Sequence, residues 1–88
     1  MFNCIFIDYD PFAMESRLVL IKDGQREYKQ VTSDLEQLSR NVTNLCYNSN
    51  IFIVKVSAPF KISSVLTKFI QETESKEYSN NKIEIEEI

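Results

Sequence analysis

Two carboxylates, Asp8 and Asp10, are the residues whose type and spacing come nearest to metal chemistry in this sequence. They follow an apolar run, and they share a face only if the strand continues past them. Cleavage of a phosphodiester by two metal ions needs several carboxylates around cations about 4 Å apart. No convincing third ligand accompanies them, and Pro11 favours a turn in which an aspartate caps free backbone amides. We therefore expect no cofactor, and Asp8 and Asp10 are metal ligands only in an alternative interpretation.

The other reactive side chains lack the neighbours that catalysis requires. The chain has no histidine, which excludes a histidine-based triad and a histidine zinc ligand. Cys4 and Cys46 are far apart in apolar surroundings, so we expect both to be small buried hydrophobic residues. Ser57 and Ser63 have no candidate base beside them in sequence. We therefore expect that the chain is not an enzyme.

The segment after the first strand carries large apolar side chains among turn residues. Tyr9, Phe12 and Met14 could anchor a protein partner if they are exposed. The competing expectation is that Phe12 and Met14 fold back onto the sheet. Tyr47 and Tyr78, at the ends of expected helices, are weaker candidates of the same kind.

The charge of the chain bears on its partners. A net charge of −3 argues against direct binding of nucleic acid, although a local basic patch is compatible with it. Acidic residues are concentrated near the end of the chain, and the last of them are Glu84, Glu86 and Glu87. Such a run is ordinarily a solvated surface. The sharper hypothesis is that it attracts a basic protein that handles nucleic acid.

Length and composition indicate one globular domain that spans residues 1–88. The N-terminus lacks the features of a signal peptide, and no apolar run is long enough to cross a bilayer, so we expect no membrane partner and a cytoplasmic location. Few glycines and many Asn, Lys and Ile residues are typical of AT-rich bacteria and their phages. This composition suggests a phage or mobile-element origin.

Three strands are expected first. Residues 2–7 are apolar on both faces, which predicts a central strand covered on both sides. Residues 17–22 form a second strand, and Asp23 and Gly24 predict a type I′ hairpin. Residues 25–31 return as a polar strand, which belongs at an edge.

Two helices and two further strands follow. Residues 33–36 match a capping box with Ser33 as the N-cap, and the helix should end near residues 48–50. Residues 51–56 are again strongly apolar, and Pro59 suits the first turn of a second helix. Residues 82–88 alternate isoleucine with glutamate, the period of a half-exposed edge strand.

The expected fold is therefore an α/β (α+β) domain with the order β-β-β-α-β-α-β and a five-stranded mixed sheet. The two most apolar strands belong in the middle and the two most polar at the edges, which gives the strand order 3-2-1-4-5. Two helices, reached by right-handed crossovers, cover the sheet.

This element order resembles the core of the ribonuclease H-like fold over nearly the whole chain. Nucleases of that family carry a metal-binding aspartate on the first strand, where Asp8 or Asp10 lies here. Residues 56–59 read Val-Ser-Ala-Pro where the family usually has a further acid, and capping explains Glu36. The resemblance implies at most a minimal or degenerate metal-dependent nuclease.

The sequence thus favours a non-enzymatic protein-binding module, an accessory or inhibitor protein, which uses the acidic surface or the apolar segment. The alternatives are the degenerate nuclease and a structural homo-oligomer. In the last case, an edge strand of one copy would extend the sheet of another.

Overall fold

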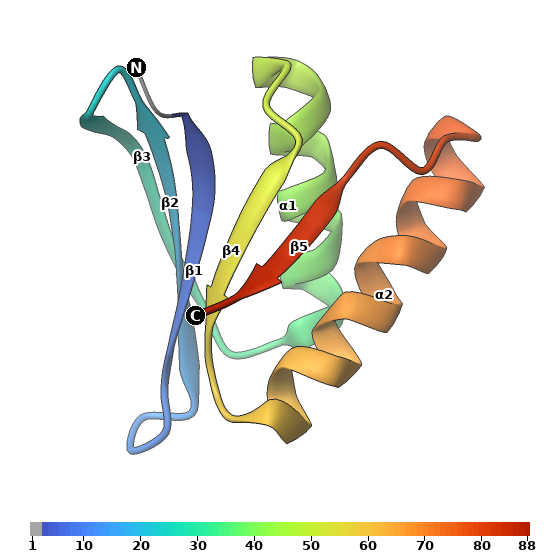
Figure 1. Cartoon of the computed structure of the whole chain (residues 1–88). Coiled ribbons are helices and arrows are strands. Elements are labelled where there is room, and N and C mark those ends of the chain that lie inside the picture. The colour runs from blue at the N-terminus through green and yellow to red at the C-terminus, as the bar shows by residue number, and fades with distance from the viewer. Residues whose placement is uncertain (1–2) are drawn as a thin grey trace.

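The computed structural model describes residues 3–88, apart from the side chains of Tyr28 and Lys29, so Phe2 of the expected first strand lies outside the described residues. Its elements in chain order are β1 (Cys4–Asp10), β2 (Glu15–Lys22), β3 (Gln25–Thr32), α1 (Leu35–Ser49), β4 (Ile53–Ser57), α2 (Phe60–Tyr78) and β5 (Glu84–Glu87). The expected α/β class is confirmed (Figure 1). Several element boundaries differ from the expected ones by a few residues.

The described strands form one mixed sheet in the order β3-β2-β1-β4-β5. The β1–β2 and β2–β3 pairs are antiparallel, whereas the β1–β4 and β4–β5 pairs are parallel. The two most apolar strands therefore lie side by side at the centre, with Ile5 opposite Val54. The polar strand β3 and the short acidic strand β5 are the edges, as their composition indicated.

The turn between β2 and β3 is the expected tight hairpin. Asp23 has a φ of 53° and Gly24 a φ of 79°, so both central residues have the positive φ that a type I′ turn requires. Glycine adopts this conformation without the steric cost that a Cβ atom would add. The Asp-Gly pair thus fixes how β3 returns along β2.

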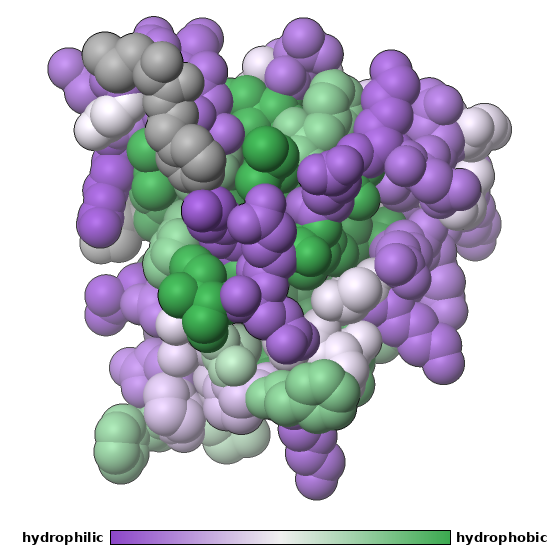
Figure 2. Space-filling view, viewed as in Figure 1, coloured by the Kyte–Doolittle hydropathy of each residue, from purple (hydrophilic) through white to green (hydrophobic). Residues whose placement is uncertain are grey.

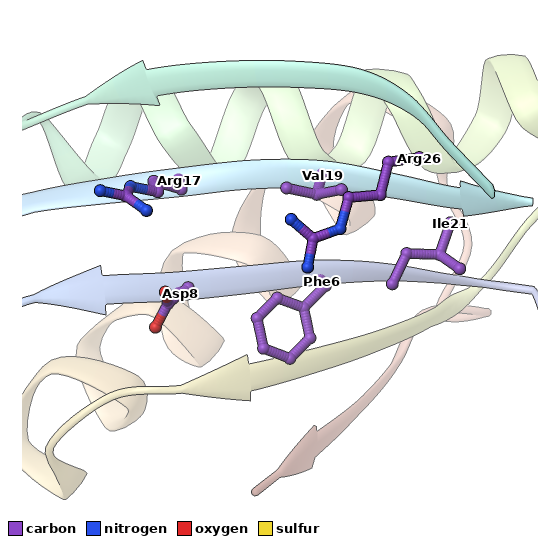
Figure 3. A pocket seen from close by; sticks show the side chains of 6 residues that line it. All are labelled: Phe6, Asp8, Arg17, Val19, Ile21 and Arg26. Carbon is purple, nitrogen blue, oxygen red and sulfur yellow. The ribbon is translucent and has the colours of Figure 1, made fainter. Parts of the chain in front are cut away.

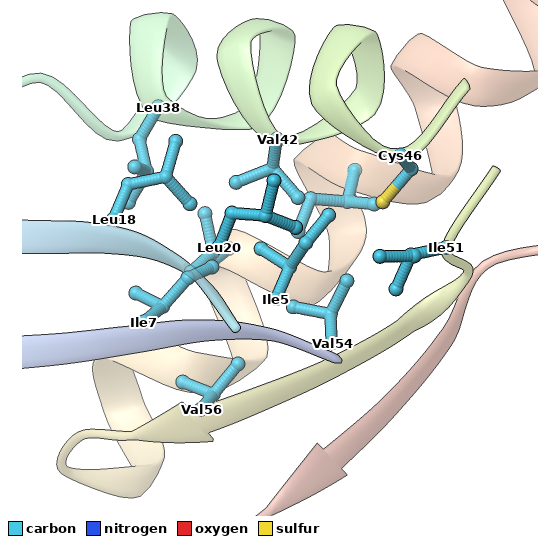
Figure 4. Packing of buried hydrophobic residues seen from close by; sticks show 12 residues of the cluster. Ile5, Ile7, Leu18, Leu20, Leu38, Val42, Cys46, Ile51, Val54 and Val56 are labelled. Carbon is cyan, nitrogen blue, oxygen red and sulfur yellow. The ribbon is translucent and has the colours of Figure 1, made fainter. Parts of the chain in front are cut away.

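Both helices pack on the same face of the sheet, which corrects the expectation that β1 is covered on both sides (Figures 1 and 4). The reason is geometric. The crossover from β3 to β4 and the crossover from β4 to β5 step across the sheet in the same direction, and right-handed connections in one direction lie on one face. The opposite face, which we call the open face, has neither of these helices over it.

The hydrophobic core lies between the sheet and the two helices. Alternate strand residues such as Ile5, Ile7 and Val54 face the helices, where Val42 of α1 lies above them (Figure 4). Leu66 of α2 belongs to the same cluster. Each of these side chains is almost completely buried. Burial of a residue of this type contributes roughly 1.5–3 kcal/mol, so this layer is the main source of stability.

The helix ends follow local sequence, with one correction. The N-cap of α1 is Asp34 rather than Ser33, and its carboxylate accepts hydrogen bonds from the backbone N–H groups of Glu36 and Gln37. A carboxylate there satisfies two otherwise free amides. The reciprocal bond of the expected capping box is not formed, because the Asp34 N–H donates to Thr32 Oγ1. Asn50 ends α1 in the left-handed conformation, as expected. Within residues 3–88, neither helix combines the length and apolar character needed to cross a lipid bilayer.

Candidate functional site

The β1–β2 turn is built around Asp10. The Oδ1 atom of Asp10 accepts hydrogen bonds from the backbone N–H groups of Phe12, at 2.9 Å, and Ala13, at 3.3 Å. These bonds satisfy amides that would otherwise be free next to Pro11, and they hold the turn in one shape. The turn-capping interpretation of Asp10 is therefore confirmed.

Asp8 and Asp10 do lie on one face of the sheet, because β1 continues to Asp10 instead of ending near residue 7 as expected. Asp8 is half-buried and lies opposite Arg17 of β2 and Ser57 of β4. Among the described residues, no three acidic, cysteine or histidine side chains gather closely enough to hold a metal ion. The arrangement thus makes Asp10 a turn-forming residue and places Asp8 on the open face.

Phe12 and Met14 project from this turn into solvent. Phe12 is 98% exposed and Met14 is 67% exposed, so the expectation that they fold back onto the sheet is wrong. The physical reason is that residues 11–14 lie beyond the last β1–β2 pair, Asp10 with Glu15, so this turn extends past the end of the two strands. Tyr9 differs from them, since it is half-buried and alternates with the residues of the open face.

Two further exposed apolar residues lie at the same end of the molecule. Because β1, β4 and β5 are parallel, their carboxyl ends meet at one edge of the sheet. Phe60, 76% exposed, begins the helix that follows β4, and Ile88, 72% exposed, follows β5. In Figure 2, separate hydrophobic patches are visible in the lower half of the view, with less hydrophobic surface between them. We call Phe12, Met14, Phe60 and Ile88 the apolar tip.

The acidic strand β5 is partly engaged by its neighbours. The Ser63 hydroxyl donates to Glu87 Oε1 at 2.6 Å, and Lys55 Nζ lies 4.0 Å from Glu86 Oε1. Glu84 is exposed at the edge. A carboxylate beside Ser63 also corrects the expectation that this serine has no base nearby. Ser63 is almost fully buried, however, so a substrate has no access to its hydroxyl.

Glu74 belongs to the acidic run near the end of the chain, which we expected to be a solvated surface, but its role is structural. It is only 2% exposed. Its Oε2 atom accepts hydrogen bonds from the Tyr47 hydroxyl at 2.5 Å, from Lys82 N–H at 2.9 Å and from Ile83 N–H at 3.1 Å. The signal was present, because Glu74 continues the four-residue spacing of Leu66 and Ile70 on the buried side of α2. This carboxylate fastens the start of the β5 segment to both helices.

Two groups near Glu74 are held in their neutral forms. Burial, assisted by the hydrogen bond to Glu74, raises the pKa of Tyr47 to about 12. Burial, assisted by the negative charge of Glu74, raises the pKa of Cys46 to about 12. Burial also raises the pKa of Cys4, against the opposing effect of Lys55. Both cysteines are free and buried, as expected, and a protonated thiol is a poor nucleophile.

The two tyrosines considered as weaker binding candidates are engaged inside the molecule. The rings of Tyr47 and Tyr78 stack with centroids 3.9 Å apart, and Tyr47 meets Phe52 edge to face. The Tyr78 hydroxyl donates to Asn44 Oδ1 at 2.6 Å. These contacts join the ends of α1 and α2, which gives both tyrosines a packing role.

Comparison of the chain with protein-family models gives no match, and neither does comparison with curated protein sequences. The assignment of function therefore depends on the residues and the geometry described above.

Proposed function

We propose that this chain is a non-enzymatic protein-binding module, an accessory or inhibitor protein, which contacts its partner through the apolar tip. The observation that carries the proposal is the almost complete exposure of Phe12 on a turn that hydrogen bonds hold in place. Aromatic side chains that enter a pocket are the residues that most often dominate the energy of protein–protein interfaces. An exposed phenylalanine has no comparable stabilising role in the free chain.

The turn is ordered before binding, which lowers the entropy lost on association. Asp10 fixes the backbone of Phe12 and Ala13. Met14 has a φ of 54°, a left-handed conformation that costs a residue with a Cβ atom roughly 1–2 kcal/mol. Strain of this kind persists at positions where the surrounding structure holds it, and such positions are often functional. Both features support a turn shaped to present its side chains.

Charge near the apolar tip indicates the chemistry of the partner. Asp10 and the exposed Glu15 flank the turn, and Glu87 precedes Ile88, against the exposed cation Lys61 that follows Phe60. An acidic rim around apolar anchors complements an apolar pocket that lysine or arginine residues surround. The proposed partner is accordingly a protein with a basic-rimmed hydrophobic pocket, a description that includes basic proteins that handle nucleic acid.

The test compares truncation of the apolar tip with truncation of an exposed apolar residue elsewhere on the surface. A partner captured from the native host is purified, and its affinity is measured for the natural chain, for the double variant Phe12→Ala/Met14→Ala and for Val65→Ala. Val65 is an exposed apolar residue of α2 outside the apolar tip. Because truncation of an anchor costs about 2 kcal/mol or more, we expect the double variant to bind at least about tenfold more weakly. Val65→Ala should bind like the natural chain.

Three results would contradict the proposal. The first is equal binding by the double variant and the natural chain. The second is complete loss of binding in high salt, which would move the contact to the acidic strand β5, since salt screens exposed charges but not apolar contacts. The third is a change in the mass in solution of the chain alone on Phe12→Ala, which would make a second copy the occupant of the apolar tip.

A further inference from the structure

The open face of the sheet carries a second surface, unrelated to the apolar tip. A shallow hollow of about 140 Å³ lies on it, lined by Phe6, Asp8, Arg17, Val19, Ile21 and Arg26 (Figure 3). Val19 is only 5% exposed although neither helix covers it. The hollow thus combines an apolar floor with charged side chains.

Two arginines on this surface are available to a ligand. Figure 3 shows the Arg26 guanidinium reaching toward the Phe6 ring, and the Arg17 guanidinium at the end of the hollow where Asp8 lies. Both arginines are exposed, and neither side chain makes a hydrogen bond or an ion pair with the side chains that the structure describes. Lys55 of β4 lies directly opposite Phe6 on its other side. Lys55 is paired with Glu86, and Asp8 lies in the same hollow, so the cations next to Phe6 that remain for a ligand are Arg17 and Arg26.

A bulge in β3 contributes one of these cations. The β2–β3 register shifts between Leu20 and Ile21, so that Ile21 pairs with Arg26. Without the shift, Ile21 would pair with Glu27, and an acidic side chain would take this place on the open face. Bulges often re-aim a side chain near a functional site, and here the effect is to replace a negative charge with a positive one.

Phe6 is placed as a platform for a flat ligand. It lies on the central strand β1, between Val19 and Lys55, and its ring is half-buried. Proteins that bind single-stranded nucleic acid stack bases on aromatic side chains and attract the phosphates with nearby cations. Arginine suits the second role because its planar fork can donate two parallel hydrogen bonds to a phosphate.

Asp8 bears on which of two anionic ligands, a nucleic acid or an acidic polypeptide, this surface would bind. A carboxylate in the hollow repels the anionic groups of either ligand, whether these are phosphates or acidic side chains. The same carboxylate can accept hydrogen bonds from the N–H groups at the edge of a base that stacks on Phe6. A ring, two phosphate-binding cations and an acceptor together match a nucleotide better than an acidic polypeptide.

We propose that the open face binds short single-stranded nucleic acid, with one base stacked on Phe6 and the adjacent phosphates paired with Arg17 and Arg26. The net charge of the chain led us to expect no direct contact with nucleic acid. A net charge for the whole chain does not reveal a local pair of arginines such as this one. With about two phosphates neutralised, the logarithm of affinity should fall with the logarithm of salt concentration with a slope of about −1.4. Such binding is weak and depends strongly on salt.

The test is fluorescence anisotropy of labelled oligothymidylate and oligouridylate with the full chain over a series of salt concentrations. Phe6→Leu keeps an apolar residue but removes the ring, so it should weaken binding about tenfold with the same salt slope. Arg17→Gln and Arg26→Gln should each weaken binding at low salt and make the slope shallower by about 0.7. Lys68→Gln, which removes an exposed cation from α2, should change nothing.

Two further measurements guard against misreading a folding defect. Thermal unfolding of each variant shows whether the fold persists. If Phe6→Leu does not fold, Phe6→Tyr retains the ring, and it should bind like the natural chain while Arg26→Gln does not. The double variant Phe12→Ala/Met14→Ala should also bind nucleic acid normally, which separates this proposal from the proposed function.

The proposal fails if the oligonucleotides do not bind at low salt, or if Phe6→Leu binds as tightly as the natural chain. It also fails if Lys68→Gln weakens binding as much as Arg26→Gln, because the attraction would then be nonspecific. Finally, it fails if a polyglutamate peptide competes as well as the oligonucleotides, since the ligand would then be an acidic polypeptide.

Discussion

The two faces of the sheet use the same strands for different purposes. On β1, Ile5 and Ile7 are fully buried under the helices, whereas Phe6 and Asp8 between and beside them stay half-exposed on the open face. The side chains of the covered face are buried against the side chains of the two helices. On the open face, the guanidinium groups of Arg17 and Arg26 make no hydrogen bond or ion pair with the described side chains. The comparison separates the residues that hold the fold together from those that are free to bind.

The largest effect is expected where a core residue is shortened. Ile7→Ala should lower the free energy of unfolding by about 2–5 kcal/mol, because it leaves a cavity between the sheet and the helices. Ile21→Ala makes the same change on the open face, where the residue is half-buried, and should cost clearly less. Urea denaturation followed by circular dichroism measures both. Equal costs would show that the open face is as tightly packed as the covered one.

The next largest effect on the free energy of unfolding is expected for Glu74, the buried carboxylate beside the start of β5. Glu74→Gln weakens the hydrogen bonds from Tyr47, Lys82 and Ile83 and should lower the free energy of unfolding by about 2 kcal/mol. Glu72→Gln is the matched control, since Glu72 is exposed on the same helix. It should shift the denaturation midpoint little. If the two variants behave alike, the buried carboxylate does not fasten β5.

Stability should also fall at high pH because of two groups on the covered side. The pKa of Cys46 is raised from 9.0, and that of Tyr47 from 10.0, to about 12 in each case, so the unfolded chain loses these protons first. Their contribution is therefore complete below pH 9 and is lost progressively as the pH rises toward 12. Denaturation at several pH values should give a flatter profile for Tyr47→Phe above pH 10. An unchanged profile would contradict the assignment.

The smallest effect is expected on the open face and at the apolar tip. Arg17→Gln, Arg26→Gln and Phe12→Ala each change an exposed side chain and should alter the free energy of unfolding by less than about 0.5 kcal/mol. Thermal denaturation of the three variants measures this. A larger loss in any of them would assign that residue to the stability of the fold.

Sequence patterns were sufficient for the features that depend on neighbouring residues. Alternation in the strands, the helical spacing of Leu38 and Val42, and the Asp-Gly turn are local, and each appears where it was expected. The central position of the two apolar strands followed from burial alone. The covering of a single face could also have been derived, since it follows from the strand order and the handedness of the crossovers.

Contacts between residues that are far apart in the sequence could not be predicted from the sequence alone. The contact between Ser63 and Glu87 joins residues 24 positions apart, and the contact between Tyr47 and Glu74 joins residues 27 positions apart. The exposure of Phe12 depends on the direction of its turn, which composition does not specify. The grouping of Arg17 and Arg26 around Phe6 required the register of three strands and a bulge in one of them.

The Glu74 carboxylate also limits where the chain can tolerate insertions and deletions. It reaches Lys82 across eight residues that include the end of α2 and the loop before β5. An insertion or deletion within this span would pull residues 82 and 83 out of reach and slide the last strand along its neighbour. In the β1–β2 turn, the side-chain hydrogen bonds come from Asp10 within the turn itself. Insertions and deletions are therefore far easier to accommodate there.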